Sequence, residues 1–195
     1  MTKNKSSKKW LASQNRDPYV KKARGLNLRS RAVYKLQEID QKDHLIKPNY
    51  CVVELGSSPG SWSQYLSNII DNRGKIIAVD ILPMQPIKSV FFISGDFTDK
   101  IIQKQCLRQV GECGADLVIS DMAPNLTGIR VTDQSRNIAL AEIVYDFSTQ
   151  ILKPGGDLLI KLFEGEGSQE YRQLLKKKFA KVLIRKPKAS RDQSR

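Results

Sequence analysis

The chain has 195 residues, a mass of 22.1 kDa and a formal net charge of +13 at pH 7. Its length suits one domain. Hydrophobic residues make up 40% of the chain, enough to form a packed core, which argues against wholesale disorder. No apolar run approaches the roughly 20 residues that cross a bilayer, and the basic start lacks the apolar segment of a secretory signal. Three cysteines without a CxxC pair and a single histidine argue against a disulfide framework or a metal centre, and they fit a cytoplasmic protein.

Helix and strand patterns alternate along the chain. Apolar spacing predicts helices over residues 17–41, 61–70, 99–110, 134–152 and 168–179. Short apolar runs predict strands over residues 51–56, 75–81, 90–97, 115–120, 157–163 and 180–186, with a turn at 153–156. This alternation indicates an α/β protein with a mostly parallel, doubly wound sheet covered by helices on both faces. We expect residues 1–15 to form a flexible basic arm and residues 16–195 to form a single domain.

The positive charge is concentrated at the two ends of the chain. Residues 1–35 have a net charge of +10 and residues 172–195 a net charge of +9, whereas the body between them has −6. Disordered tails that serve solubility are one explanation. Both basic segments also contain core-forming residues, such as Val33 and Val182, which would hold the charges on a folded surface. A nucleic acid is therefore the favoured polyanionic partner.

A glycine-containing turn, GSSPGS (56–61), follows the first predicted strand, where doubly wound sheets bind ligands. Considered alone, this glycine-containing segment could equally be an ordinary strand-to-helix connection that binds no ligand. Acids at the ends of the first three strands favour a ligand: Glu54, Asp80 for ribose hydroxyls, and Asp96 for an adenine amine. Together they predict an adenosine that lies across the strand ends.

The form of the turn separates the adenosine cofactors. A dinucleotide site needs GxGxxG, and this turn lacks the middle glycine, while Pro59 removes a backbone donor. A Walker A motif is absent as well. A cofactor without phosphates fits better, which indicates S-adenosylmethionine, whose positive sulfonium suits the acids Glu54 and Asp121.

Two lysines are candidates for chemistry near Asp121. Lys161 lies in the apolar run LLIKLF, where burial of an ammonium group is costly. The structural alternative is a lysine at the strand end that reaches water and pairs with Glu164. In the catalytic interpretation Lys161 is a general base, kept partly neutral by burial and by a second cation. Lys35 could be that cation, although a solvated helix lysine is the simpler explanation of Lys35 alone.

Four motifs together resemble one known family. Residues 25–188 are similar to the bacterial RrmJ/FtsJ (RlmE) ribose methyltransferases, through LRSRAVYKL (28–36), ELGSSPGSWSQYL (54–66), SDMAPN (120–125) and KLFEGEG (161–167). The resemblance implies a Rossmann-like S-adenosylmethionine-dependent methyltransferase fold, in which the cofactor contacts Gly60, Trp62, Asp80, Asp96 and Asp121. It also implies methylation of a uridine 2′-hydroxyl in 23S rRNA of the large ribosomal subunit, by a cytoplasmic monomer.

The family's catalytic set is Lys-Asp-Lys-Glu, and Lys35, Asp121 and Lys161 occupy its first three positions. The family's glutamate follows a Ser-Arg pair on a final antiparallel strand, whereas this sequence stops at Ser194-Arg195. We therefore expect that strand to be missing here, because the natural chain continues further. A catalytically inactive RNA-binding or ribosome-assembly module is the main rival, and an NAD-dependent oxidoreductase is a distant third.

Overall fold

The computed structural model describes residues 16–190. Its centre is a parallel sheet of five strands in the order β3-β2-β1-β4-β5. The strands are β1 (Cys51–Leu55), β2 (Lys75–Asp80), β3 (Val90–Ser94), β4 (Ala115–Ser120) and β5 (Leu152–Ile160). The helices are α2 (Pro18–Gly25), α3 (Val33–Asp43), α4 (Ser61–Ser67), α5 (Lys100–Val110), α6 (Arg130–Ile151) and α7 (Ser168–Lys178). The predicted doubly wound α/β architecture is confirmed.

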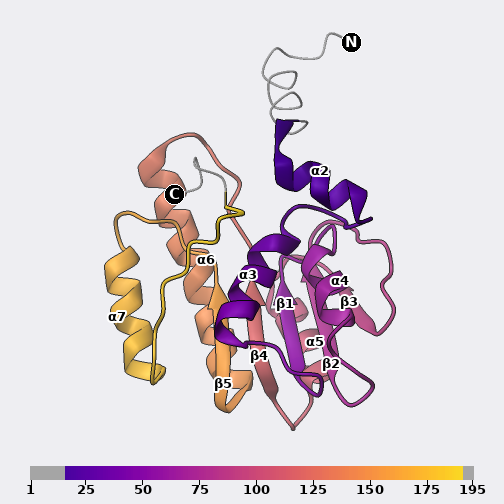
Figure 1. The fold of residues 1–195 in the computed structure, drawn as a ribbon. Helices are drawn as coiled ribbons and strands as arrows, with labels where there is room; N and C mark the ends of the chain where they lie inside the picture. Colours follow the sequence, from indigo (N-terminus) through magenta and orange to yellow (C-terminus); the bar gives the residue numbers. More distant parts are fainter. Residues whose placement is uncertain (1–15, 191–195) are drawn as a thin grey trace.

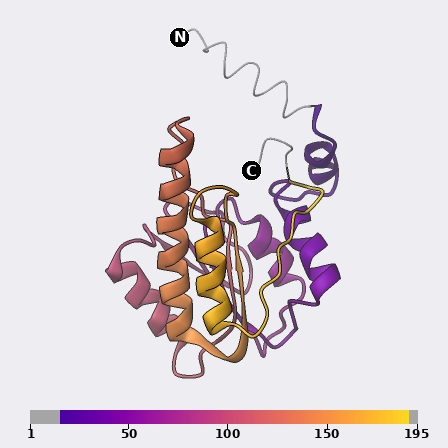
Figure 2. The same ribbon diagram turned by 90° about the vertical axis from the view of Figure 1, so that its left-hand side faces the viewer.

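Helices cover both faces of the sheet because successive strand residues point to opposite sides. Val52 and Ile76 pack with residues of α3 and α4, whereas Val53 and Ile77 pack with residues of α5 and α6. Figures 1 and 2 show these two layers, with α7 beside α6. The three central strands β2, β1 and β4 are buried along nearly their whole length, which is why their sequences are continuous apolar runs.

The first predicted helix is in fact two helices, α2 and α3. Asp17 caps α2, since its carboxylate accepts from the Tyr19 N–H at 2.9 Å. Gly25 ends α2, and Asn27 adopts a left-handed φ of 52°, so the helix cannot continue. Residues 26–32, which we call the linker, connect the two helices and lie near the carboxyl ends of the strands (Figure 1).

Two further element boundaries differ from the sequence prediction. α6 begins at Arg130 rather than at residue 134 because Asp133 holds the preceding loop: its carboxylate accepts from the N–H groups of Thr127 at 2.7 Å and Gly128 at 3.1 Å. β5 begins at Leu152, and the predicted turn at 153–156 forms an irregularity inside this strand. Gly155 and Gly156 therefore lie at a bend of the chain, as predicted, but this bend is inside β5.

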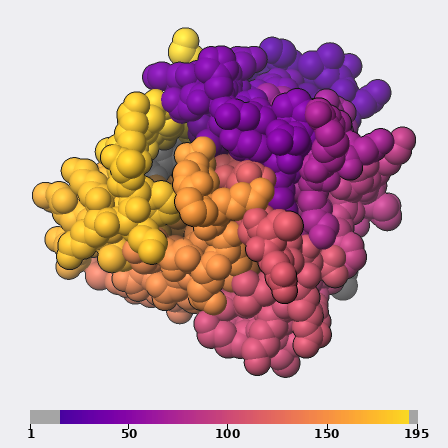
Figure 3. All heavy atoms as spheres, turned by 90° about the horizontal axis from the view of Figure 1, so that it is seen from below, coloured from indigo at the N-terminus to yellow at the C-terminus, as the bar shows by residue number. Residues whose placement is uncertain are grey.

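The sixth predicted strand is wrong for residues 180–186, which form no strand in the described structure. This segment is bonded to α3, where the Arg185 guanidinium donates to both carboxylate oxygens of Asp43, at 2.8 and 2.6 Å. The Lys188 N–H likewise donates to Glu38 at 2.8 Å. Seen from below, the surface is hollowed between the yellow C-terminal part of the chain and the orange part (Figure 3).

No helix among residues 16–190 is both long enough and apolar enough to span a bilayer. The predicted basic arm, residues 1–15, and the Ser194-Arg195 end lie outside the described residues, so the predictions made for them stay predictions.

Truncation of Leu66 should lower the stability of the fold strongly, because this side chain is fully buried between α4 and the sheet. We expect Leu66→Ala to lower the free energy of unfolding by about 2–5 kcal/mol, through lost burial and the cavity left behind. Urea denaturation measures this value. Lys104→Ala, on the exposed face of α5, is the control and should stay within about 0.5 kcal/mol of the parent. Equal effects of the two substitutions would contradict the assigned packing.

Candidate active site

Asp121 lies between two lysines at the carboxyl end of the sheet. Asp121 directly follows the last residue of β4, and its N–H donates to the Leu55 carbonyl at 3.2 Å. The Lys35 Nζ, from α3, lies 3.3 and 3.2 Å from the two carboxylate oxygens of Asp121. The Lys161 Nζ lies 3.3 Å from the same carboxylate and donates to the Asp121 carbonyl at 3.2 Å. The structure therefore brings together the three residues predicted to be catalytic, with two positive charges around one negative charge.

These three side chains are partly shielded from water. Their exposed fractions are 26% for Lys35, 20% for Asp121 and 33% for Lys161. Lys161 lies just after the end of β5, not inside the strand, although its N–H still donates to the Ser120 carbonyl at 3.0 Å. The suggested partner Glu164 instead binds Arg172, at 2.8 Å. The strand-end alternative was thus correct about position and wrong about the partner.

The glycine turn contacts Asp80 through its backbone. The Ser58 N–H donates to one carboxylate oxygen of Asp80 at 2.7 Å, and the Leu82 N–H donates to the other at 2.8 Å. Each oxygen keeps a further lone pair, so Asp80 can still accept from ribose hydroxyls. Gly56 has a φ of +78°, and a Cβ there would lie 2.7 Å from the Met122 side chain. Glycine is needed here so that the turn can approach the loop after β4.

Asp96 follows β3 and is exposed. One of its carboxylate oxygens accepts from both the N–H and the hydroxyl of Thr98, each at 2.8 Å. Its other oxygen accepts from no described group, so it is available to an amine. The place of Asp96 is therefore compatible with the predicted adenine contact.

Glu54, which was expected to suit the positive sulfonium together with Asp121, is buried. Its side chain is 1% exposed and lies within the protein, where it accepts a hydrogen bond from the Ser63 hydroxyl. Burial raises the pKa of Glu54 to about 8; the Ser63 hydrogen bonds oppose this rise, and the negative charges of Asp121 and Asp80 add to it. At neutral pH Glu54 is a neutral hydrogen-bonding group.

Trp62 is part of the hydrophobic core. The resemblance implies a cofactor contact, yet its side chain is only 6% exposed and packs between α4 and the sheet. Its indole N–H donates to the carbonyl of Ala32 at 2.8 Å, which attaches the linker to α4. Ser30 and Ser61 form a second attachment, with 2.6 Å between their hydroxyl oxygens.

Arg29 is a residue that the sequence analysis did not single out. Its guanidinium donates to three carbonyls: Pro59 at 2.9 Å, Gln85 at 2.7 Å and Pro86 at 3.0 Å. It therefore ties the linker both to the glycine turn and to the loop between β2 and β3. A Cβ on Gly60, whose φ is +96°, would lie 2.8 Å from this guanidinium, so Gly60 makes room for Arg29. The signal available in the sequence was its position within the motif LRSRAVYKL (28–36), where the sequence analysis counted it only as surface charge.

The residues around the glycine turn fit a polar cofactor such as the expected adenosine derivative. The hydroxyl of Ser57, next to Gly56, is buried and has no hydrogen-bond partner among the described residues. Buried polar groups in proteins nearly always have a partner. With Asp80 and Asp96 at neighbouring strand ends, this orphaned hydroxyl indicates that a ligand completes the site. No group of three or more potential metal ligands occurs within residues 16–190.

The raised pKa of Glu54 predicts a pH-dependent stability. In the unfolded chain Glu54 ionises near its ordinary value of 4.5, whereas in the folded chain it keeps its proton to about pH 8. Unfolding therefore releases a proton in this window, and the contribution of Glu54 to stability falls as pH rises from 4.5 to 8. We expect Glu54→Gln to lose less stability than the parent between pH 5 and pH 8, as measured by urea denaturation. Parallel pH profiles would contradict the neutral Glu54.

Comparisons with known proteins identify the family of the chain. Residues 28–195 match the model of the family described as FtsJ-like methyltransferase. A Pseudomonas paraeruginosa protein named ribosomal RNA large subunit methyltransferase E is 49% identical over 195 residues, which cover 100% of this chain and 94% of that protein. An Azoarcus protein of the same name is 45% identical over 194 residues, covering 100% and 95%.

A solved structure resembles the whole fold. The crystal structure of a putative ribosomal RNA methyltransferase from Plasmodium falciparum superposes with a TM-score of 0.75 and 29% identity, covering 83% of this chain and 92% of that chain. Sequence and fold thus agree over nearly the full length, and the chain belongs to the FtsJ-like methyltransferase family.

Proposed function

We propose that the chain is a cytoplasmic, monomeric enzyme that transfers a methyl group from S-adenosylmethionine to the 2′-hydroxyl of a uridine ribose in 23S rRNA. The observation that carries this proposal is the placement of Asp121 between Lys35 and Lys161 at the carboxyl end of the sheet. The names of the relatives, which act on large-subunit ribosomal RNA, support the substrate class.

The protein's main task in this reaction is to position two reactants. S-adenosylmethionine, when bound, supplies a methyl carbon that its sulfonium already activates. Asp80 and Asp96 would hold the cofactor's sugar and base, and Asp121 would face its positive charge. Alignment of a nucleophile with such a carbon can supply a large share of the rate.

The two lysines would act on the target ribose. The neutral amine form of Lys161 would take the proton of the 2′-hydroxyl at its Nζ as the oxygen attacks, and Lys35 would steer the ribose. Asp121 positions both lysine side chains, since it lies within 3.3 Å of each Nζ. General-base catalysis of this kind contributes about 10²–10⁴-fold to a rate.

The alternative is an RNA-binding or ribosome-assembly module without catalysis. The three residues of the site are present and in contact, which favours the enzyme. Transfer of tritium from labelled cofactor to large ribosomal subunits separates the two, and nuclease mapping of the product should show 2′-O-methyluridine. An absence of transfer, with RNA binding intact, would favour the module.

Lys161 provides the sharper test of mechanism. We expect Lys161→Ala to lower methyl transfer by at least about 100-fold while cofactor affinity changes little. Lys161→Arg should be equally inactive because a guanidinium does not release its proton at working pH. The measurement is single-turnover transfer by each variant beside the unsubstituted chain. Substantial turnover by Lys161→Arg would remove the base assignment and leave a positioning role.

Arg29 should control cofactor affinity. Lysine keeps the charge but cannot donate to three carbonyls in the planar geometry of a guanidinium. We expect Arg29→Lys to raise the dissociation constant of S-adenosylmethionine about tenfold, or about 1.4 kcal/mol, as measured by calorimetry. Arg73→Lys, in the exposed turn before β2 where Arg73 binds Asp71, is the matched control and should leave the affinity unchanged. Unchanged affinity of Arg29→Lys would mean that the cofactor site does not depend on this contact.

A further inference from the structure

The first turns of α6 contain three buried polar side chains. Asp133, Gln134 and Asn137 are 8%, 7% and 1% exposed. The buried face of a helix is normally apolar, and a polar group that is taken out of water is costly unless it forms a hydrogen bond. The partners of these three side chains therefore show which part of the molecule this end of α6 holds in place.

Two of these side chains bind the backbone of one residue, Phe163. The Phe163 N–H donates to Oδ1 of Asn137 at 2.7 Å, and Nε2 of Gln134 donates to the Phe163 carbonyl at 3.0 Å. Gln134 and Asn137 lie three positions apart, so they share one face of the helix. We call this pair the amide clasp. It binds both backbone groups of Phe163, as a neighbouring β-strand would.

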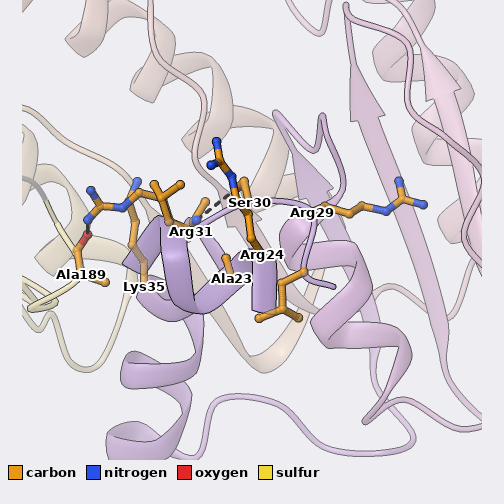
Figure 4. Close-up of a pocket in the computed structure, with 10 residues that line it drawn as sticks. Ala23, Arg24, Arg29, Ser30, Arg31, Lys35 and Ala189 are labelled. Carbon is orange, nitrogen blue, oxygen red and sulfur yellow. Dashed lines mark hydrogen bonds between the residues drawn. The ribbon is translucent and has the colours of Figure 1, made fainter. Parts of the chain in front are cut away.

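The amide clasp lies two residues beyond Lys161, which has few other backbone supports. Lys35 extends from the first turn of α3 (Figure 4), where its N–H donates to the Ala32 carbonyl at 3.1 Å. Lys161 instead follows the end of β5, and its N–H donates to the Ser120 carbonyl at 3.0 Å. The bonds to Phe163 give the chain around Lys161 a second fixed point, on the other side of the residue.

The same turns of α6 also hold the loop that begins at Asp121. The carboxylate of Asp133 binds the N–H groups of Thr127 and Gly128 in this loop, at 2.7 and 3.1 Å. Asp133 and Gln134 are adjacent in the sequence, so one short stretch of helix binds the loops after both β4 and β5. This stretch can therefore hold Asp121 and Lys161 at a fixed separation, in which the Lys161 Nζ lies 3.3 Å from the carboxylate.

We propose that Gln134 and Asn137 are positioning residues for the methyl transfer: their carboxamides hold the backbone beyond Lys161 and so set where its Nζ lies relative to Asp121 and the target ribose. The inference rests on the proposed function, because it takes Lys161 to act on that ribose. It adds that buried side chains of α6, which bind only backbone groups of the loop, determine the place of the lysine.

Substitutions in the amide clasp should slow the reaction without weakening cofactor binding. Gln134→Met removes the donor and keeps an unbranched side chain, and Asn137→Ala removes the acceptor. Since a misplacement of about 1 Å can cost about 100-fold in rate, we expect each variant to lower single-turnover transfer by about 10- to 100-fold. The dissociation constant of S-adenosylmethionine, measured by calorimetry, should stay within about twofold of the parent value, because the clasp holds the loop of Lys161.

The matched control is Ser148→Ala. Ser148 is a fully buried polar residue of the same helix, and its hydroxyl donates to the Val144 carbonyl at 2.6 Å, inside α6. This variant also loses a buried hydrogen bond, but it should keep the parent rate. Parent rates in both clasp variants, or an equal loss of rate in the control, would overturn the positioning role.

A spectroscopic measurement reports on Lys161 without turnover. In protein whose lysine ε-carbons are labelled with carbon-13, the resonance of Lys161 is the one that Lys161→Ala removes. We expect this resonance to shift in Gln134→Met and in Asn137→Ala, and to stay in place in Ser148→Ala. A clasp that only stabilises the fold would leave the resonance unmoved in all three folded variants, and this result would overturn the proposal.

Hydrogen exchange of the Phe163 amide tests the amide clasp in the unaltered protein, so it does not depend on whether a variant folds. We expect this amide to exchange much more slowly than in an unstructured peptide, because Asn137 binds it. Exchange at the rate of an unstructured peptide would overturn the proposal. Neither this measurement nor the Lys161 resonance involves methyl transfer, so failure of the positioning role and failure of the proposed reaction can be told apart.

Discussion

The carboxylate of Asp121 is the point on which the arrangement of the site depends. It joins α3, the end of β4 and the end of β5, because Lys35 comes from the first and Lys161 follows the last. A partly buried cation that loses its counter-charge is costly. The carboxylate of Asp121 therefore both positions and stabilises the two lysines.

The parallel sheet is what makes this meeting possible. Parallel strands all present their carboxyl ends at one edge, so Lys161, 40 positions from Asp121 along the chain, becomes its neighbour. Lys35, 86 positions away, reaches the same edge from α3. The same edge holds Asp80 and the glycine turn. The linker then closes the edge from above, since Trp62, Ser61 and the turn itself all bond to it.

Much of this could be predicted from the sequence, and the failures have physical causes. The strands and the Lys35, Asp121 and Lys161 set were predictable because burial on both faces demands apolar runs and because their motifs are specific. Glu54 was misplaced because a strand pattern does not show how deep a side chain lies. Residues 180–186 have the composition of a strand, but a strand also needs a hydrogen-bonding partner, which composition cannot provide.

Other features depend on tertiary contacts between distant segments. Nothing local distinguishes Arg29 from the other arginines near it, since its three acceptors lie 30, 56 and 57 residues away. The early start of α6 depends on a side chain, Asp133, that reaches back to the loop before it. The hydrogen bond from Arg31 to the Ala189 carbonyl likewise joins residues that lie 158 positions apart.

Gly60 shows what such contacts mean for interpreting variation. A side chain at this position would meet three neighbours at once: the sulfur of Met84, the guanidinium of Arg29 and the side chain of Ile87. Its positive φ adds a backbone penalty for any other residue. A substitution at Gly60 would therefore displace the loop after β2 and the linker together. One change of side chain in the glycine turn would thus alter two segments that are far apart in the sequence.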